Sequence, residues 1–599
     1  MDIKFLETIY RNRAEENKQL GQQLKEKYNR FSVVRLIAFF AGIGIALFLS
    51  DYGIIVVVTF LVLYILAFGQ FIAWHQKIAQ QRKKHEILHE VNANELKYLE
   101  LDFVDFENGK SFADPLHANA VDLDLFGDYS IFQYINRAST SIGQSRLAQF
   151  LTNMATFPEI TARQKASQEL STQLDWRQDF QVLSNQTEDS KREIELLKNW
   201  LNDDNYIVLG KKWLNIVLYI FPIVTLSLVI AMFFGLSYQI ALISFIGEMV
   251  LLRQFVLKVN ETHAQTAEAE KFLKKYARII AHIETKEFES NHLKVTQQQF
   301  STPTTSASKA LRRLSYIISQ LNVRYNIFAV VLSGTVLWDL QWIKKLEAWK
   351  SDMREHLPEW FDALQEFEAI NSLATLRYNH PDWTYPTIEP NNPNLVGVEL
   401  GHPLIHRDKR ITNDFSLAQK GQMKLITGSN MAGKSTFLRT IGLNIVLAMI
   451  GAPVCAKRLE LPLLEVYTSM RTQDALQEST SSFYAELKRL KVIIEAVESR
   501  DNVFYLLDEI LKGTNSNDRH KGAKALILQL IQTQGMGIVA THDLELGELE
   551  ANYSDAIENL CMEVEVLEQD LVFDYKLKKG VSQSFNATFL MKNMGIKVD

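Results

Sequence analysis

Two long apolar stretches, residues 33–74 and 213–255, constrain the fold of this chain more than any other feature. Each is nearly free of charge and too long for a single membrane-crossing helix, which needs roughly 20 apolar residues. Short turn-forming segments, 50–53 and 235–238, interrupt the stretches near their middles. The sequence therefore predicts two transmembrane helical hairpins with four spans. Two pairs of buried core helices are the alternative interpretation.

The residues that flank these stretches predict the orientation of the hairpins. Lysine and arginine are enriched beside spans on the cytoplasmic side of a membrane. Asp51 is the one charged residue in the two outer turns, whereas basic residues lie at the other ends of both hairpins. We therefore expect a multi-pass protein of the inner (cytoplasmic) membrane, with both termini and all soluble parts in the cytoplasm. The basic residues are Lys4, Arg11, Arg13, Lys18, Lys25, Lys27, Arg30 and Arg35, then Lys77, Arg82, Lys83 and Lys84, and finally Lys211, Lys212, Arg253 and Lys258.

Charged residues beside and within the apolar stretches allow two further predictions. Residues 1–32 are charged and lack the apolar segment of a signal peptide, so we expect an amphipathic cytoplasmic helix. Glu248 and Arg253 lie near the end of the fourth predicted span. Polar residues in spans can mark transport pathways, but near a boundary these two are predicted to snorkel or to cap a helix.

The remainder of the chain divides into helical segments and one α/β segment. Helical periodicity dominates residues 75–210 and 257–385. After a cluster of four prolines between residues 381 and 393, short β-branched runs alternate with helical ones, which is typical of a parallel sheet flanked by helices. The sequence thus predicts an α/β domain preceded by an all-α region that contains the two hairpins. The predicted segments are 1–32, 33–74, 75–210, 211–256, 257–385 and 386–599.

Cysteine content and net charge exclude several classes of protein. The only cysteines, Cys455 and Cys561, suit a reducing compartment and argue against a disulfide scaffold or a cysteine-based metal site. The formal net charge of −6 shows no overall basic character. Any contact with nucleic acid would therefore depend on a local basic patch.

A nucleotide-binding motif opens the α/β domain. Residues 428–435 fit the pattern G-x-x-x-x-G-K-[ST] in full, after a strand-like run at 424–427 and before a helix-like run. In such a P-loop, backbone N–H groups and a helix N-terminus bind phosphates. Lys434 is expected to reach the β- and γ-phosphates of ATP, and Ser435 to ligate Mg²⁺. The predicted nucleotide-binding residues are Gly428, Ser429, Asn430, Met431, Ala432, Gly433, Lys434, Ser435 and Thr436.

Two further strand-like runs end in polar residues. The run 503–507 delivers Asp508 and Glu509 at its carboxyl end, where ligands of parallel sheets bind. Asp508 is predicted to hold Mg²⁺ through water, and Glu509 to polarise the water that attacks the γ-phosphate. His542, after the run 537–541, is predicted to sense the γ-phosphate. The predicted catalytic residues are therefore Lys434, Glu509 and His542.

These motifs resemble those of the MutS family of DNA mismatch-repair ATPases. Five segments carry the resemblance: 426–436 with the pair Asn430-Met431, 478–486, 508–515, 540–542 and 576–580. The resemblance implies a P-loop ATPase of the MutS/ABC-like class that uses ATP and Mg²⁺ and forms a homodimer. A serine-rich segment at 478–486 is similar to one that, in the family, reaches the nucleotide of the partner subunit. The corresponding residues here are Ser479, Ser481 and Ser482.

The resemblance covers roughly residues 112–597 and is partial before residue 401. Weaker similarity to the helical core of the family is found at 136–147, 158–169 and 369–376. Residues 1–111 show no counterpart of the mismatch-reading domain, the connector domain is also missing, and the second hairpin interrupts the region of levers and clamp. Ile411 stands where the family often has an aromatic residue against the adenine.

By resemblance, the target of the helical core is DNA, either mismatched or branched. Basic residues at 271–275 and 312–313 are candidates for phosphate contacts, and solvated helix faces are the alternative interpretation. An ABC-type transporter is disfavoured because no LSGGQ-like signature lies between the P-loop and Asp508 and few polar residues could line a path. An ATP-driven membrane switch or scaffold that acts on a protein partner stays open.

Overall fold

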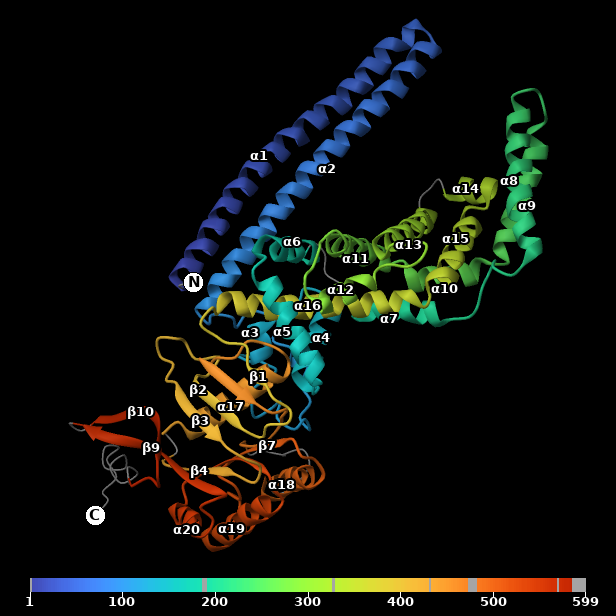
Figure 1. The fold of residues 1–599 in the computed structure, drawn as a ribbon. Coiled ribbons are helices and arrows are strands. Elements are labelled where there is room, and N and C mark those ends of the chain that lie inside the picture. The colour runs from blue at the N-terminus through green and yellow to red at the C-terminus, as the bar shows by residue number, and fades with distance from the viewer. Residues whose placement is uncertain are drawn as a thin grey trace.

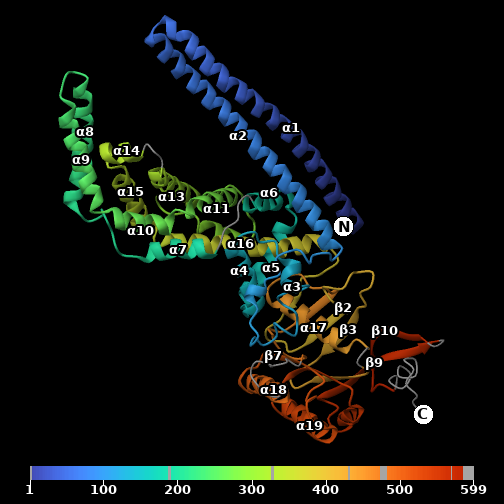
Figure 2. The same ribbon diagram turned by 180° about the vertical axis from the view of Figure 1, so that it is seen from behind.

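The computed structural model describes residues 3–185, 191–325, 329–429, 432–471, 482–567 and 570–583. A layer of helices forms the middle of the molecule, and an α/β domain lies on one side of it (Figure 1). Two helical hairpins rise from the other side, away from the α/β domain, as the reverse view in Figure 2 also shows. The hairpins join opposite ends of the helical layer.

The first hairpin consists of α1 (Ile3–Leu49), the short η1 (Ser50–Tyr52) and α2 (Ile54–Leu99). The predicted amphipathic helix and the first predicted span form one uninterrupted helix, α1. Its foot is buried against the helical layer, with Leu6 and Tyr10 at most 1% exposed. Its upper part instead exposes large apolar side chains, including Ile37 at 63% and Phe48 at 67%. The hairpin therefore has a packed foot and an uncovered apolar tip.

A polar cluster marks the transition between foot and tip. His75 is buried, stacks on Tyr28 with ring centroids 4.2 Å apart, and its Nε2 lies 3.2 Å from Ser32 Oγ. Arg35 Nη1 lies 3.4 Å from the other ring nitrogen. Since His75 follows the apolar stretch directly, this cluster lies where the uncovered apolar surface ends.

The second hairpin consists of α8 (Lys212–Met232) and α9 (Tyr238–Arg253), followed by α10 (Val256–Thr266). By length and composition alone, three helices are suited to cross a membrane: α1, α2 and α8. The fourth predicted span, α9, reaches sufficient length only together with α10, and these two helices are bent by 63° relative to each other. The described residues therefore provide three such helices, or four if the bent pair counts as one span.

The helical layer is built around α16 (His356–Asn379), which is buried along most of its length. Ala369, Leu373 and Leu376 of α16 pack into the core of the α/β domain, whereas Phe361 and Phe367 pack among the other helices. One helix thus joins both cores. The other helices are α3 (Ile131–Ile135), α4 (Ser141–Thr152), α5 (Phe157–Ser171), α6 (Leu174–Ser184), α7 (Lys191–Asn202), α11 (Ala269–Glu284), α12 (Asn291–Gln298), α13 (Ala307–Asn322), α14 (Ala329–Val336) and α15 (Trp338–Met353).

The α/β domain contains a six-stranded sheet in the order β10-β9-β4-β8-β7-β6, parallel except for the β9–β10 pair. A four-stranded sheet, β1-β5-β2-β3, lies beside it. The strands are β1 (Thr387–Ile388), β2 (Leu395–Leu400), β3 (Asn413–Leu417), β4 (Met423–Thr427), β5 (Arg458–Leu461), β6 (Glu465–Ser469), β7 (Val503–Asp508), β8 (Met536–Thr541), β9 (Ile557–Leu567) and β10 (Asp570–Lys579). The helices are α17 (Lys434–Met449), α18 (Ser482–Ser499), α19 (Ser516–Gln532) and α20 (Leu549–Asn552).

Buried polar contacts fix the foot of the first hairpin to the helical layer. Glu95 of α2 accepts two hydrogen bonds from the Arg137 guanidinium, at 2.7 and 3.0 Å, and one from Asn379 at 2.7 Å. Tyr10 of α1 donates to the same Asn379 at 2.7 Å. A buried charge pair that lost one partner would be costly, so these contacts require α1, α2 and α16 to stay together.

Candidate nucleotide-binding site

The P-loop residues lie where a buried strand turns into a buried helix. β4 is buried along its whole length and α17 begins at Lys434, directly after Gly433. Gly433 has φ +96°, a backbone conformation that side chains other than that of glycine rarely adopt, so the turn requires glycine here. The described loop residues Gly428, Ser429 and Ala432 complete the turn, whereas Asn430 and Met431 lie outside the described residues.

The ammonium group of Lys434 points into this loop. Its Nζ donates to the carbonyl oxygens of Gly428 at 2.7 Å and Ser429 at 2.9 Å. Burial lowers the pKa of Lys434, although the nearby carboxylates of Glu509 and Asp508 oppose this effect. A buried ammonium group whose hydrogen-bond partners among the described residues are neutral carbonyls is well placed to bind an anionic ligand.

Ser435 and Asp508 face each other across the carboxyl edge of the sheet. The Ser435 hydroxyl, in the first turn of α17, donates to Oδ2 of Asp508 at the end of β7. Burial raises the pKa of Asp508, and the hydrogen bond from Ser435 partly opposes this effect. A hydroxyl and a carboxylate are the oxygen donors that Mg²⁺ prefers, so this pair fits a magnesium site next to a bound phosphate.

Glu509 and His542 complete the edge of the sheet. β7 and β8 run parallel with Asp508 opposite Ala540, which places Glu509 and His542 side by side. The His542 Nδ1 lies 3.7 Å from Glu509 Oε1, and Lys512 Nζ lies 3.1 Å from Glu509 Oε2. The structure thus brings Lys434, Ser435, Asp508, Glu509 and His542 to the ends of three neighbouring strands.

Residues 424–596 match the family model described as MutS domain V. This match includes the whole P-loop motif, which begins at Gly428, and also Asp508, Glu509 and His542.

Residues 424–596 are thus similar to a domain of the MutS family.

Similarity to individual relatives extends over less than half of the chain. The chain is 30% identical over 253 residues to "DNA mismatch repair protein MutS" of Thermotoga neapolitana and 28% identical over 250 residues to the protein of that name from Thermotoga maritima. It is 26% identical over 258 residues to "MutS protein homolog 4" of Homo sapiens. Each alignment covers 41% of this chain, but only 31%, 31% and 26% of the respective relative. The chain thus matches less than a third of the length of these relatives.

A pocket of about 290 Å³ adjoins the P-loop of the MutS domain. Gly433, Thr436 and Thr440 line one side, and Ile405 and Ile411 line another. Ile411 is 43% exposed, as a residue that covers a ligand from the solvent side would be. The position beside the phosphate loop and the apolar lining suit a nucleoside base.

Tyr575 is a lining residue of this pocket that the motifs did not indicate. It belongs to β10, and its ring lies so close to Gly433 that a Cβ atom there would come within 2.8 Å of it. Asn413 of β3 fixes the strand, because its Nδ2 donates to the Tyr575 carbonyl at 3.0 Å and its Oδ1 accepts from the Leu577 N–H at 2.9 Å. The family-like segment 576–580 lies next to Tyr575 and is the only local signal for it.

Most of the serine-rich segment lies outside the described residues. Ser479 and Ser481 are among those not described, and Ser482 is the first residue of α18. In the next turn of α18, Glu486 accepts a hydrogen bond from the Leu511 N–H, just beyond Glu509. A Cβ atom on Gly513 would lie 2.7 Å from the Phe483 side chain. The start of α18 therefore packs on the turn that follows the two carboxylates.

A loop from the helical region, residues 117–124, also reaches the MutS domain. Asp122 is buried and accepts hydrogen bonds from the Thr468 hydroxyl at 2.7 Å and from the Met470 and Arg471 N–H groups at 3.2 and 3.0 Å. Arg489 of α18 donates to the carbonyl oxygens of His117 and Ala118. The loop thus holds both ends of the segment that contains the serine-rich residues.

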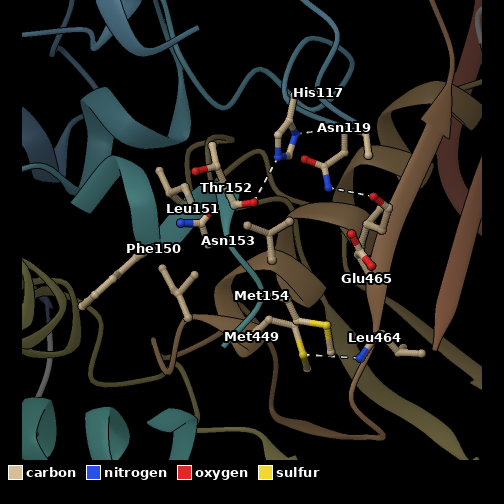
Figure 3. A pocket seen from close by; sticks show the side chains of 14 residues that line it. His117, Asn119, Phe150, Leu151, Thr152, Asn153, Met154, Met449, Leu464 and Glu465 are labelled. Carbon is tan, nitrogen blue, oxygen red and sulfur yellow. Dashed lines mark hydrogen bonds between the residues drawn. The ribbon is translucent and has the colours of Figure 1, made fainter. Parts of the chain in front are cut away.

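Figure 3 shows the junction beneath this loop, where α4, α17 and β6 meet. His117 Nε2 lies 3.1 Å from the Thr152 carbonyl oxygen, and Asn119 Nδ2 donates to the Val466 carbonyl at 2.8 Å. The cavity between these residues is about 50 Å³, too small for a nucleotide. The junction is therefore a packed contact between the helical region and the MutS domain rather than a second ligand site.

Proposed function

We propose that this protein is a membrane-anchored MutS-like ATPase that binds ATP with Mg²⁺, hydrolyses it, and couples the reaction to DNA binding, as in DNA mismatch repair. The observation that carries the proposal is the convergence of Lys434, Ser435, Asp508 and Glu509 at the carboxyl edge of one sheet. The similarity of residues 424–596 to a family of ATPases supports the reaction class.

Each of these residues has a distinct role in the proposed reaction. Lys434 exchanges its two carbonyl partners for β- and γ-phosphate oxygens, and Ser435 and Asp508 hold the metal. Bound Mg²⁺ would neutralise the phosphate charge during phosphoryl transfer. Glu509 orients the attacking water and accepts its proton, and His542 contacts the γ-phosphate from the end of β8. Positioning and charge stabilisation account for most of the acceleration in such reactions.

A homodimer completes the proposed site. Ser479, Ser481 and Ser482 of one subunit would contact the nucleotide of the partner, as the family resemblance implies. The contact of Phe483 and Glu486 with the turn 510–513 supports this arrangement, because it starts α18 at the edge of the nucleotide site. The buried Asp122 then connects movement of this segment to the helical region.

The two hairpins are the proposed membrane anchors. The tip of the first exposes apolar side chains on both helices, such as Ile37 at 63% and Ile55 at 78%. The second does the same, with Ile223 at 64% and Ile243 at 69%. Exposed apolar surface of this extent on a soluble protein would promote aggregation. Both hairpins project to the same side of the helical layer, so one bilayer could hold both (Figures 1 and 2).

DNA is the proposed target, by family resemblance. Lys271 and Lys274 of α11 and Arg312 and Arg313 of α13 have exposed side chains, which phosphate contacts require. Lys275 does not fit this role because it is buried. The contact surface would therefore involve the two adjacent helices α11 and α13.

The decisive experiment is DNA binding by the full-length protein in detergent, with and without ATP and Mg²⁺. Homoduplex, mismatched and branched duplexes are compared across a salt series. We expect ATP-sensitive binding with a preference for mismatched or branched DNA, and a salt slope that decreases when Arg312 and Arg313 are replaced by glutamine. In a matched control, Lys344 and Lys345 of α15 are replaced by glutamine.

Binding that is equal for all duplexes and insensitive to ATP would refute the DNA function. If ATP hydrolysis persisted in that case, the protein would be an ATP-driven switch with a protein partner. Pelleting with membranes is measured separately on the same preparation. Recovery in the soluble fraction after carbonate extraction would refute the anchoring without affecting the ATPase assignment.

A further inference from the structure

Three polar side chains meet inside the second hairpin. Thr225 of α8 donates a hydrogen bond to Glu248 Oε1 of α9 at 2.6 Å, and its Oγ1 lies 2.5 Å from Ser244 Oγ. Glu248 is 0% exposed and Thr225 is 1% exposed. The expectation that Glu248 snorkels or caps a helix is therefore wrong, because its carboxyl group points into the helix–helix interface.

The surroundings of this cluster are apolar. The outward side chains of the hairpin include Ile220, Ile223, Ile243 and Ile246, all at least half exposed. Glu248 lies ten residues after the start of α9, about 15 Å from the outer turn at a rise of 1.5 Å per residue. The hydrocarbon core of a bilayer is about 30 Å thick, so the carboxyl group would lie inside it, about two-thirds of the way along α9 from the outer turn.

The short helix α14 covers one side of the hairpin. A Cβ atom on Gly334 would lie 2.1 Å from the Phe245 ring of α9, so only glycine permits this approach. The backbone of Leu337, at the join of α14 and α15, lies beside the Glu248 carboxyl group. The Oε2 atom of Glu248 is buried without a hydrogen-bond partner among the residues that the structure describes.

No described cation neutralises Glu248. Of the ionisable residues on the packed elements, Lys212 and Arg253 lie at the cytoplasmic ends of α8 and α9, and α14 carries none. Lys344 of α15 lies over the Tyr219 ring of α8, 4.7 Å from its centroid. Arg324, which precedes α14, pairs with Asp339 of α15 at 3.4 Å. The Thr225 hydroxyl and the backbone of Leu337 offset only a small part of the cost of placing an ionised carboxylate in an apolar medium, so the group keeps its proton instead.

We infer that Glu248 is a proton-binding site within the membrane, held as a neutral carboxylic acid at neutral pH by the enclosure of α8, α9 and α14. Release of the proton would require water to enter between the hairpin and α14. Since α15 continues directly from α14 into the helical layer, protonation of Glu248 would stabilise the contact between that layer and the second hairpin. This inference rests on the membrane insertion proposed above.

The test uses dicyclohexylcarbodiimide, an apolar reagent that adds to protonated carboxyl groups. Full-length protein in phosphatidylcholine vesicles is treated across a pH series, and the labelled residue is identified by peptide mass mapping. We expect labelling of Glu248 at pH 7 and none of Glu26, whose side chain is 74% exposed. Labelling should decline at alkaline pH and disappear in Glu248→Gln. Thr225→Val removes a donor that favours the ionised form, so the pH of half-labelling should rise.

Labelling of Glu248 only at the acidic pH at which Glu26 also reacts would overturn the inference, as would an unchanged midpoint in Thr225→Val. Membrane placement is tested independently with a water-soluble maleimide. Thiols are introduced by Ile243→Cys in the span and by Val295→Cys on α12, which is 48% exposed; both native cysteines are buried. Slow reaction at 243 together with an unlabelled Glu248 overturns the proton site alone. Equal reaction at both positions overturns the proposed insertion.

Discussion

The Ser435 hydroxyl donates a hydrogen bond to Asp508 Oδ2 and so joins the first turn of α17 to the end of β7. Both groups offer oxygen atoms to a metal, and β7, which carries Asp508 at its end, is buried along its whole length. This contact keeps the proposed metal ligands in register before any ligand binds. Pre-positioned groups of this kind reduce the reorganisation that binding would otherwise require.

Asp508→Asn should separate stability from metal binding. Burial raises the pKa of Asp508, so the folded protein disfavours its ionised form, and this loss of stability increases as pH rises through the raised pKa. The variant without the charge should therefore melt at the same or a higher temperature at pH 7 in the absence of ligand. It should also lose the stabilisation that Mg²⁺ and ATP give the parent. Differential scanning fluorimetry in detergent measures both, and a lower melting temperature without ligand would contradict the prediction.

The raised pKa of Asp508 also predicts how metal binding depends on pH. Mg²⁺ requires the carboxylate, so Mg²⁺-dependent nucleotide affinity should fall on acidification at a higher pH than an ordinary aspartate would cause. Titration with a fluorescent ATP analogue between pH 5 and 8 tests this. Binding without Mg²⁺ is the control, because it should not show the same midpoint.

Lys434→Ala should abolish detectable ATP binding. Its Nζ provides the charged donor in the loop, and loss of charge-assisted hydrogen bonds of about 1.5–3 kcal/mol each lowers affinity at least about tenfold per bond. Equilibrium binding of labelled ATP is the measurement. Lys420→Ala, at a surface ion pair with Asp501, is the matched control and should bind like the parent. Equal binding by both variants would refute the role of Lys434.

Glu509→Gln should retain ATP and prolong the dimer. The amide preserves the shape of the side chain but does not accept the proton of the attacking water, so turnover should fall about 100-fold or more. Phosphate release and analytical ultracentrifugation with ATP measure the two effects. The control is Glu548→Gln, at an exposed position outside the site. Hydrolysis by Glu509→Gln at the parental rate would remove this residue from the mechanism.

His380 should make the protein sensitive to mild acid. Burial, together with nearby arginines, lowers the pKa of His380 to about 3, and burial lowers that of His402 to about 4. An unfolded histidine binds a proton below about pH 6.5, so stability is present above this pH and lost as pH falls towards 4. For one such histidine, the loss at pH 5 is about 2 kcal/mol.

The measurement is the fall in melting temperature from pH 7.5 to pH 5. It should be smaller in His380→Gln, which keeps a hydrogen-bond partner for Tyr134, now 2.6 Å from the ring nitrogen. His356→Gln is the control, since that side chain is 38% exposed. A fall in melting temperature that is identical in His380→Gln and the parent would show that other groups govern acid stability.

The sequence motifs predict neighbouring positions in the fold because each motif is a local strand–turn–helix or strand end. Gly428, Lys434, Asp508 and His542 all lie at such positions, and parallel strand pairing then brings them to one edge. The motifs do not indicate Tyr575, because its place in the pocket depends on a hydrogen bond from Asn413, which lies 162 residues earlier. No pattern in a single sequence encodes a pairing of this range.

The helical region shows the same limit more clearly. Asp122 appears as an ordinary loop aspartate in the sequence, yet it binds the end of β6 at Thr468, 346 residues away. The sequence predicted the wrong environment for Glu248, because its position near the end of an apolar run suggested the boundary between membrane and water. Only the direction of its side chain towards Thr225 shows that it is enclosed.

The uninterrupted helix α1 begins at the MutS domain, where Glu7 pairs with Arg407 at 2.7 Å, and ends at the hairpin tip. Arg407 belongs to the loop that also supplies Ile405 and Ile411 to the pocket beside the P-loop. If both hairpins lie in the bilayer, as proposed, the helical layer would be held at two separate points and could not swivel about either. The membrane would then serve as a fixed frame, and a rearrangement around a bound nucleotide would move the α/β domain against that frame instead of turning the whole molecule.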